Sequence, residues 1–184
     1  MMNNKKYYKM KKDIEYFDKK EQENFDKLVE FNDNILHLEL MGQTPRRHHT
    51  DASGYTSTSR YFNIELKERN QELRQKDDGT YYIHGITNNN KEYTCNGIYI
   101  EQHKVCSMML DYICNGYEPI YINFLNNCII VYNLAKLKTR PNTDLAKKIK
   151  SSGYGAFEIG SREDLSLKDA TIYDYNYNLI KRPE

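Results

Sequence analysis

The segment Tyr61-Phe62-Asn63-Ile64-Glu65-Leu66-Lys67 shows the clearest local pattern in this chain of 184 residues. Apolar and polar side chains alternate along it, and a period of two is typical of a β-strand with one buried face. The apolar side chains are therefore expected to pack on helices. Glu65 and Lys67 project together from the other face, roughly 7 Å apart, because each residue advances a strand by about 3.3 Å. A carboxylate and an ammonium group thus lie side by side.

Helical patterns flank this strand in the sequence. From about Asp18 to Leu38, apolar residues recur every three or four positions among acids and lysines, which predicts an amphipathic helix. A second helix is expected to begin near Glu101, and Gly116 beyond its end is a typical C-cap. The order of helix, strands, helix and strand pair indicates an α/β fold with a central mixed β-sheet.

Turn residues divide the rest of the chain. The region of about 70–97 contains two turn motifs and predicts an inserted β-hairpin. Asn126-Asn127 separates two apolar runs and predicts a tight hairpin. A short extended piece is expected to end near Asp51, and the Gly-, Ser- and Thr-containing stretch that follows, up to Ser59, predicts a turn or loop.

The length suits a single domain with a tail. We expect a basic, polar N-terminal segment over residues 1–17, an α/β core over 18–140, and a C-terminal part over 141–184. Within that last part, Pro141-Asn142-Thr143-Asp144 predicts the entry to a short helix that ends at about Lys150. The tyrosines beyond it predict an aromatic tail packed on the core.

Composition narrows the class of protein. The chain is 39% hydrophobic and 29% charged, which is typical of a globular protein. The formal charge is +1 and the pI about 7.6, so a surface that binds nucleic acid would have to be local. The four cysteines form no CxxC pair, which predicts buried, reduced thiols.

The same sequence indicates a cytoplasmic protein. No apolar stretch follows the polar first residues, and none approaches the length that crosses a bilayer, so neither secretion nor a membrane span is expected. Asn, Lys, Tyr and Ile are abundant, as an AT-rich genome would encode. That bias fits a low-GC bacterium or one of its phages, in which case the location is the cytoplasm of the host.

Asp51, Glu65 and Lys67 form the strongest candidate for chemistry. If the segment that contains Asp51 pairs antiparallel with the strand, its carboxylate reaches the same spot as Glu65. Two carboxylates, the backbone carbonyl of Leu66 and water are the ligands that Mg²⁺ prefers. Hydrolysis of a phosphodiester requires such a cation and a group that orients water, and Lys67 is suited to the second role.

With these elements in place, the sequence resembles the PD-(D/E)xK nuclease superfamily, in particular its small phage nucleases and Holliday-junction resolvase-like members. The resemblance covers roughly residues 23–134, although no proline precedes Asp51. The matching elements are a first helix, Asp51, a glycine-containing loop, the strand at 62–67, a later helix opening at 98–104, and the strand at 119–124.

The resemblance implies both a fold and a function. The fold would be a restriction-endonuclease-like core, a central mixed β-sheet flanked by helices. The function would be that of an endonuclease dependent on Mg²⁺ or Mn²⁺ that hydrolyses phosphodiester bonds in DNA, including branched junctions. Because cutting paired strands needs two centres related by symmetry, a homodimer is expected. The family also has an acid on the first helix that supports the metal site, and here Asp26 and Glu30 are both candidates.

Two alternatives concern the surroundings of this centre. Glu101 lies on an apolar line of the second helix, with Lys104 three positions on, so the two form either a local ion pair or a link by which Lys104 or Glu101 reaches the catalytic centre. Phosphate contacts are assigned to basic side chains near the site, against the alternative of a solvated basic turn. These candidates are Arg46, Arg47, His49, Arg60 and Arg69.

Two alternatives also concern the function. A catalytically inactive protein with a nuclease fold could bind nucleic acid or serve as a structural part of a phage. In a plain interaction protein, by contrast, the acid-x-Lys triplet would be accidental. Glu65 and Lys67 would then lie on an exposed sheet face, far from Asp51.

Overall fold

The strand around Glu65 is confirmed as β3 (Tyr61–Glu68), the third strand of a seven-stranded sheet. The computed structural model describes residues 19–43, 50–87, 89–139, 142–145, 149–150, 157–158 and 161–184. The sheet has the order β1-β2-β3-β8-β9-β14-β15, in which β3 and β8 are parallel and the other neighbours antiparallel. Its other strands are β1 (Glu39–Gln43), β2 (Ala52–Tyr55), β8 (Glu118–Phe124), β9 (Ile129–Asn133), β14 (Thr171–Tyr173) and β15 (Leu179–Lys181).

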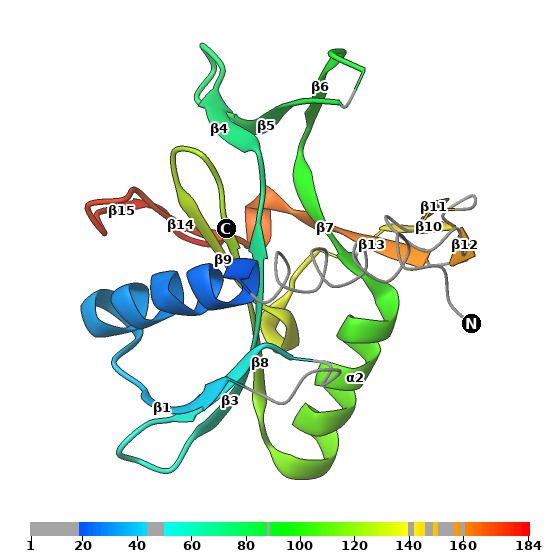
Figure 1. Ribbon diagram of the computed structural model, residues 1–184. Coiled ribbons are helices and arrows are strands. Elements are labelled where there is room, and N and C mark those ends of the chain that lie inside the picture. The colour runs from blue at the N-terminus through cyan, green and yellow to red at the C-terminus, as the bar shows by residue number, and fades with distance from the viewer. Residues whose placement is uncertain are drawn as a thin grey trace, which may run out of the picture.

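Two helices cover opposite faces of this sheet, as the nearly edge-on view in Figure 1 shows. The N-terminal helix, described over 19–31 and followed by a π-helical turn (Asn32–Leu36), packs its apolar side chains on Ile64 and Leu66. On the other face, α2 (Gln102–Asn115) buries Val105 and Met108 against the side of the sheet that carries the tyrosines of β8 and β9. The expected α/β class, with a mixed sheet between helices, is thereby confirmed.

The surroundings of Asp51 differ from expectation. The extended segment does not end at Asp51, because β2 begins at the next residue and the turn falls at 56–60. The prediction that Ala52 and Gly54 lie in a loop is therefore wrong. Gly54 packs tightly against β1, where an added Cβ would lie 3.2 Å from the carbonyl oxygen of Glu39, so a small residue suits this strand.

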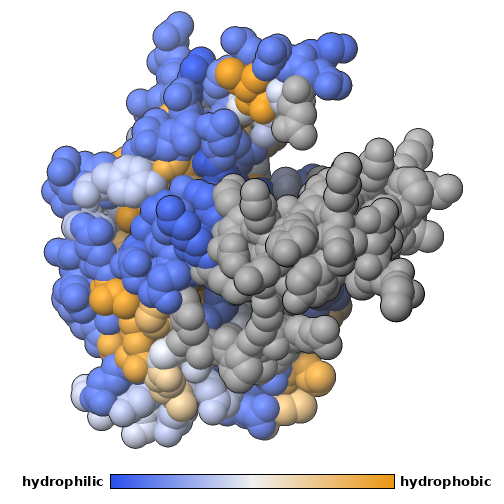
Figure 2. All heavy atoms as spheres, in the orientation of Figure 1, coloured by the Kyte–Doolittle hydropathy of each residue, from blue (hydrophilic) through white to orange (hydrophobic). Residues whose placement is uncertain are grey.

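The region of about 70–97 forms a projecting arm. Its strands are β4 (Gln71–Gln75), β5 (Tyr81–Ile86) and β6 (Glu92–Cys95), which pair in the order β4-β5-β6. The hairpin expected here is thus present, with a third strand added to it. Figure 2 shows the arm standing apart from the body at the top of the view. After it, β7 (Gly97–Glu101) returns to the body and leads directly into α2.

The C-terminal part is extended where a helix was expected. Strand β10 (Asn142–Leu145) pairs with β13 (Ser161–Ser166), which in turn pairs with β7, while β11 (Ile149–Lys150) pairs with β12 (Phe157–Glu158). The predicted helix entry is wrong, because Asn142 and its neighbours gain partners on β13 that local sequence does not reveal. The packed aromatic tail is confirmed, since the Tyr173 ring lies 5.5 Å from that of Phe31 on the N-terminal helix.

Several local predictions hold. Gly116 caps α2 with a φ of 75°, and its N–H donates to the carbonyl of Tyr112. Asn126 and Asn127 form the turn between β8 and β9. All four cysteines are free, but only Cys128 is fully buried, so the expected burial is wrong for the others. Within the described residues, no helix combines the length and apolar character that a membrane crossing requires.

Candidate active site

Glu65 lies at the centre of the candidate site. It occupies the middle of β3, and its side chain faces α2 with no exposed surface, in contrast to the exposed sheet face that an accidental triplet would have. Its Oε2 atom has no hydrogen-bond partner among the described residues. A buried carboxylate oxygen without a donor is unfavourable in an apolar interior, so this oxygen is suited to an ion or a water molecule.

Asp51 is brought to Glu65 by strand pairing. Ala52 of β2 pairs with Ile64 of β3, and Asp51, the residue before β2, donates its N–H to the carbonyl of Ile64 over 2.9 Å. Asp51 is thereby close enough to Glu65 for its charge to raise the pKa of that carboxyl group. The Asp51 Oδ2 atom accepts a hydrogen bond of 2.7 Å from the N–H of Leu66. Because the N–H and C=O groups of a strand residue point to the same side, the Leu66 carbonyl also faces the edge where Asp51 lies.

Lys104 reaches Glu65 from the first turn of α2, where its ammonium donates a short hydrogen bond to Oε1 of the carboxylate. A cation at this end of a helix is opposed by the helix dipole, so the ion pair with Glu65 must offset that cost. Of the two alternatives for the Glu101 and Lys104 pair, the structure shows the one in which the lysine contacts the centre.

Lys67 lies between two carboxylates. Its ammonium is 3.8 Å from Oε1 of Glu65 and 3.7 Å from Oε1 of Glu101, the last residue of β7. Glu101 also has a buried Oε2 atom without a hydrogen-bond partner among the described residues. The side chains of Lys67 and Glu101 are each about one-third exposed, so Lys67 connects the buried Glu65 carboxylate with the surface.

The electrostatics of the site set Glu65 apart. Burial raises the pKa of Glu65 to about 7, with a contribution from the charge of Asp51 and against the opposing effect of Lys104 and Lys67. Burial would lower the pKa of Lys104, but its contact with Glu65 raises it. For Glu101, burial is outweighed by Lys67 and other favourable contacts, which lower its pKa. Near neutral pH, Glu65 can therefore exchange a proton while Lys104 and Glu101 stay charged.

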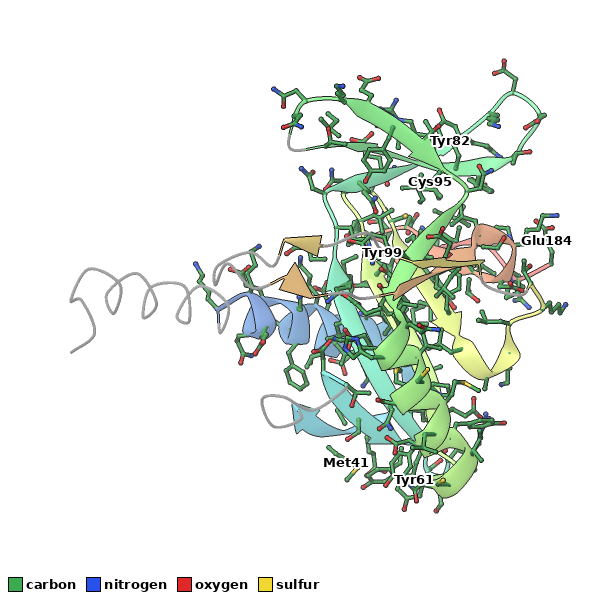
Figure 3. All side chains as sticks on the ribbon, turned by 90° about the vertical axis from the view of Figure 1, so that its right-hand side faces the viewer. Met41, Tyr61, Tyr82, Cys95, Tyr99 and Glu184 are labelled. Atoms are coloured by element: carbon green, nitrogen blue, oxygen red, sulfur yellow. The ribbon has the colours of Figure 1, made fainter. Side chains whose placement is uncertain are left out.

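A second charge, partly buried, follows the end of β3. Arg69 donates through Nε to Asn123 over 2.8 Å and through Nη2 to the backbone carbonyl of Tyr99 and the hydroxyl of Tyr121, both over 2.6 Å. Its guanidinium also lies 4.3 Å from the centre of the Tyr99 ring. Figure 3 shows Tyr99 on β7, between α2 and the arm. We refer to these four residues as the Arg69 cluster.

The remaining predicted residues lie elsewhere. Asp26 accepts a hydrogen bond from Gln22 on the exposed side of the N-terminal helix, and Glu30 bonds with Tyr177 of the C-terminal part. Neither Asp26 nor Glu30 contacts the centre. Arg60 is paired with Glu118 at the far end of β3. Three further candidates, Arg46, Arg47 and His49, lie outside the described residues.

Sequence patterns missed the Arg69 cluster. Tyr121 and Asn123 fall in an apolar run that predicts a plain buried strand, and both are fully buried. An asparagine inside such a run is the one available signal, since a buried amide needs a partner. Nothing local identifies that partner as Arg69.

Similarity to known proteins adds nothing to this picture: no protein-family model matches the chain, and neither a curated protein nor a solved structure is significantly similar to it.

Proposed function

We propose that this protein is a metal-dependent endonuclease of the PD-(D/E)xK type that hydrolyses phosphodiester bonds in DNA. The observation that carries the proposal is the convergence of Asp51, Glu65 and Lys67 where β2 and β3 pair, with one buried oxygen of Glu65 that has no donor in the described part of the chain. An acid-x-Lys triplet on an isolated strand is common, whereas a triplet that meets a second acid next to the neighbouring strand is much rarer.

The arrangement of elements also supports a restriction-endonuclease-like core. A first helix, the antiparallel strands β1, β2 and β3, the helix α2 and the parallel strand β8 follow one another along the chain. This order agrees with the elements on which the resemblance to that superfamily rests. The arm formed by β4, β5 and β6 is inserted between β3 and β7 without interrupting the large sheet.

The donor set fits Mg²⁺ or Mn²⁺. Asp51, Glu65 and the carbonyl of Leu66 would hold the ion, since hard divalent cations take one or two carboxylates, carbonyl oxygen and water. Within the described part of the chain, no group of three His, Cys, Asp or Glu side chains is gathered around one point, so water would complete the coordination. A bound cation supplies positive charge that activates water and stabilises the transition state of hydrolysis.

The lysines define the roles of the surrounding protein. Lys104, bonded to Oε1 of Glu65, holds the carboxylate so that Oε2 is the free oxygen. Lys67 is partly exposed and is the cation that can contact a scissile phosphate and orient the attacking water. Glu101 positions Lys67 from β7.

Cleavage assays test the proposal directly. Linear duplex, single-stranded and four-way-junction DNA would be incubated with the wild type and with Asp51→Asn and Lys67→Ala in the presence of Mg²⁺ or Mn²⁺. Loss of a group that stabilises developing charge reduces the rate by roughly 10²- to 10³-fold, and we expect at least this for both variants. Asp77→Asn, in the exposed turn between β4 and β5, is the matched control.

The outcome also separates the alternatives. The proposed nuclease activity is wrong if the wild type cuts none of these substrates, or if the variants cut as well as the wild type. DNA binding without cleavage would favour a nuclease fold reused as a binding module. Sedimentation of the active species tests the proposed homodimer, since a monomer that cuts both strands of a junction would contradict it.

A further inference from the structure

A polar hollow of about 540 Å³ lies beside the candidate active site, between the N-terminal helix and the end of β3. Three cations line it: Lys20 from the helix, and Lys67 and Arg69 from β3 and the residue after it. Lys67 thus faces both this hollow and the Glu65 carboxylate, from which it is 3.8 Å away. The hollow and the proposed catalytic centre are neighbours along one strand.

The single acid in the lining is already neutralised. Glu68 receives hydrogen bonds of 3.0 Å from Lys20 and 2.7 Å from Lys27, a lysine of the same helix that does not line the hollow. The hydrogen bond from Lys27 is the largest cause that lowers the pKa of Glu68, and Lys20 adds to it. Lys20 also lies 3.2 Å from Glu23 of the same helix, so the uncompensated positive charge of the lining comes mainly from Arg69, whose partners are neutral.

The rest of the lining consists of asparagines, Asn24, Asn70 and Asn126. The Asn126 amide donates to Asn70 over 3.0 Å, which holds the wall in place. The side-chain oxygen of Asn24 is buried without a partner among the described residues. Because a half-turn of an amide exchanges its oxygen and nitrogen, Asn24 can present a donor instead. Cations and amides around one space are suited to an anion with several acceptor oxygens.

Arg69 provides a rigid wall. Its Nε and Nη2 atoms are bonded to Asn123, Tyr99 and Tyr121, so the guanidinium needs no rearrangement before an anion binds. A preorganised cation loses little conformational entropy on binding, whereas a free surface lysine loses more. The position of the hollow, roughly 7 to 13 Å along β3 from Glu65, corresponds to two to four strand residues. This separation places it beside the scissile bond, not on it.

We propose that this hollow binds a non-scissile phosphate of the nucleic-acid strand whose neighbouring bond is held at Glu65, with Lys20, Arg69 and Asn24 as the groups that recognise it. The proposal rests on the proposed nuclease function for its substrate. In this proposal the N-terminal helix, through Lys20 and Asn24, positions the nucleic-acid strand. The phosphate is either an internal diester or a terminal monoester, and the two present the same acceptor oxygens to these donors.

Binding measured without divalent cation tests the site independently of cleavage. Single-stranded oligothymidylate with a 5′ hydroxyl, a 5′ phosphate or a 3′ phosphate would be titrated with the full chain in EDTA. The wild type would be compared with Lys20→Met. Loss of one phosphate contact should weaken binding roughly fivefold and reduce the slope of log affinity against log salt by about 0.7. An effect on all three oligonucleotides indicates an internal phosphate, and an effect on one terminal form indicates that end.

Two matched variants control for other causes. Lys27→Met removes the shorter of the two bonds to Glu68 but no lining group, and Lys19→Met removes a lysine of the same helix that is 77% exposed. Both should bind like the wild type apart from a small general loss of charge. Glu68→Gln should bind more tightly, because it removes the one acid from the lining.

The results separate the two proposals. If Lys20→Met binds no more weakly than Lys27→Met and Lys19→Met, the phosphate site is wrong. If the wild type binds through Lys20 but cuts no substrate, the proposed nuclease activity is wrong and the proposed phosphate site is supported. Where cleavage is observed, Lys20→Met should raise KM by the same factor and leave kcat unchanged, since Lys20 contacts neither Glu65 nor Lys67.

Discussion

Two charged side chains, the buried Glu65 and the partly buried Arg69, lie four residues apart along the chain, and their surroundings differ. Arg69 is bonded by neutral acceptors from β7 and β8, and an aromatic ring lies against its guanidinium. Glu65 has two lysines near one oxygen, the charge of Asp51 nearby, and another oxygen that no donor of the described residues reaches. The Arg69 guanidinium has acceptors within the protein, although the Nδ2 atom of Asn123 has no hydrogen-bond partner among the described residues. The unpartnered atom of the Glu65 site is a carboxylate oxygen, which is suited to an added ion or water molecule.

This difference indicates separate roles. Arg69 joins β3 to β7 and β8, which fixes the strands that position the candidate site. Glu65 retains unfavourable burial and a pKa of about 7, as expected of a group used in binding or chemistry instead of stability. Four measurements test the comparison, in order of decreasing effect.

The largest effect on stability is expected for Arg69→Met. Removing the guanidinium leaves the buried acceptors on Tyr121 and Asn123 without their donor, while the Tyr99 carbonyl keeps the Tyr121 hydroxyl at 3.0 Å. Such a loss reduces the free energy of unfolding by about 4 kcal/mol. Urea denaturation measures it. Arg74→Met is the control: Arg74 is 46% exposed and pairs with the exposed Glu72, so its loss should change stability by less than about 1 kcal/mol. Equal effects of the two variants would mean that the Arg69 cluster is not a scaffold.

Glu65→Gln should alter how stability depends on pH in the metal-free protein. Below pH 4.5 the carboxyl group is protonated in both folded and unfolded chains. As the pH rises to about 7 the unfolded chain ionises first, so the folded state loses stability, by up to about 3 kcal/mol for a pKa raised from 4.5 to about 7. The loss is complete above that pH.

The Gln variant has no such ionisation, so its stability relative to the wild type should increase between pH 5 and pH 8. Thermal or urea unfolding at both pH values gives the difference. A wild-type stability that rises over this range with no change in the variant would contradict the raised pKa of Glu65.

Mg²⁺ or Mn²⁺ should stabilise the wild type. An ion at ten times its Kd adds about 1.4 kcal/mol to the free energy of unfolding, a rise in Tm of roughly 3 to 6 °C for a chain of this size. The shift should be greater at pH 8 than at pH 6, because Glu65 must lose its proton before it can hold a cation. Asp51→Asn should show little or no shift, and an equal shift in this variant would exclude Asp51 as a ligand.

The smallest effect is expected for Lys104→Met. Without its nearest cation, Glu65 should have a pKa above about 7, which moves the acid limb of the cleavage profile to higher pH. For a shift of about one unit, activity at pH 7 falls roughly fivefold and recovers near pH 9. Lys168→Met, at an exposed position, serves as the control. A uniform loss at every pH would instead indicate that Lys104 contacts the substrate.

Local pattern predicted part of this site and missed the rest. The alternation in β3 correctly predicted that Glu65 and Lys67 share a face, because side chains alternate in any strand. The position of Asp51 relative to β2 was wrong, since the stretch from Ala52 to Tyr55 is rich in residues typical of turns and becomes a strand by pairing with β1 and β3. The strand at Asn142–Leu145 escaped prediction for the same reason.

By itself, the sequence determined the elements whose signals are local: the period of β3, the helical periods on either side of it, Gly116 as a cap and Asn126-Asn127 as a turn. Only the tertiary structure decided which charges meet. Lys104 could pair with Glu101 three residues away or with Glu65 across the α2 interface, and Arg69 could point to solvent or inward. Such choices depend on long-range packing and burial, because the energy of a charge is set by the groups around it in space and not by its neighbours in the chain.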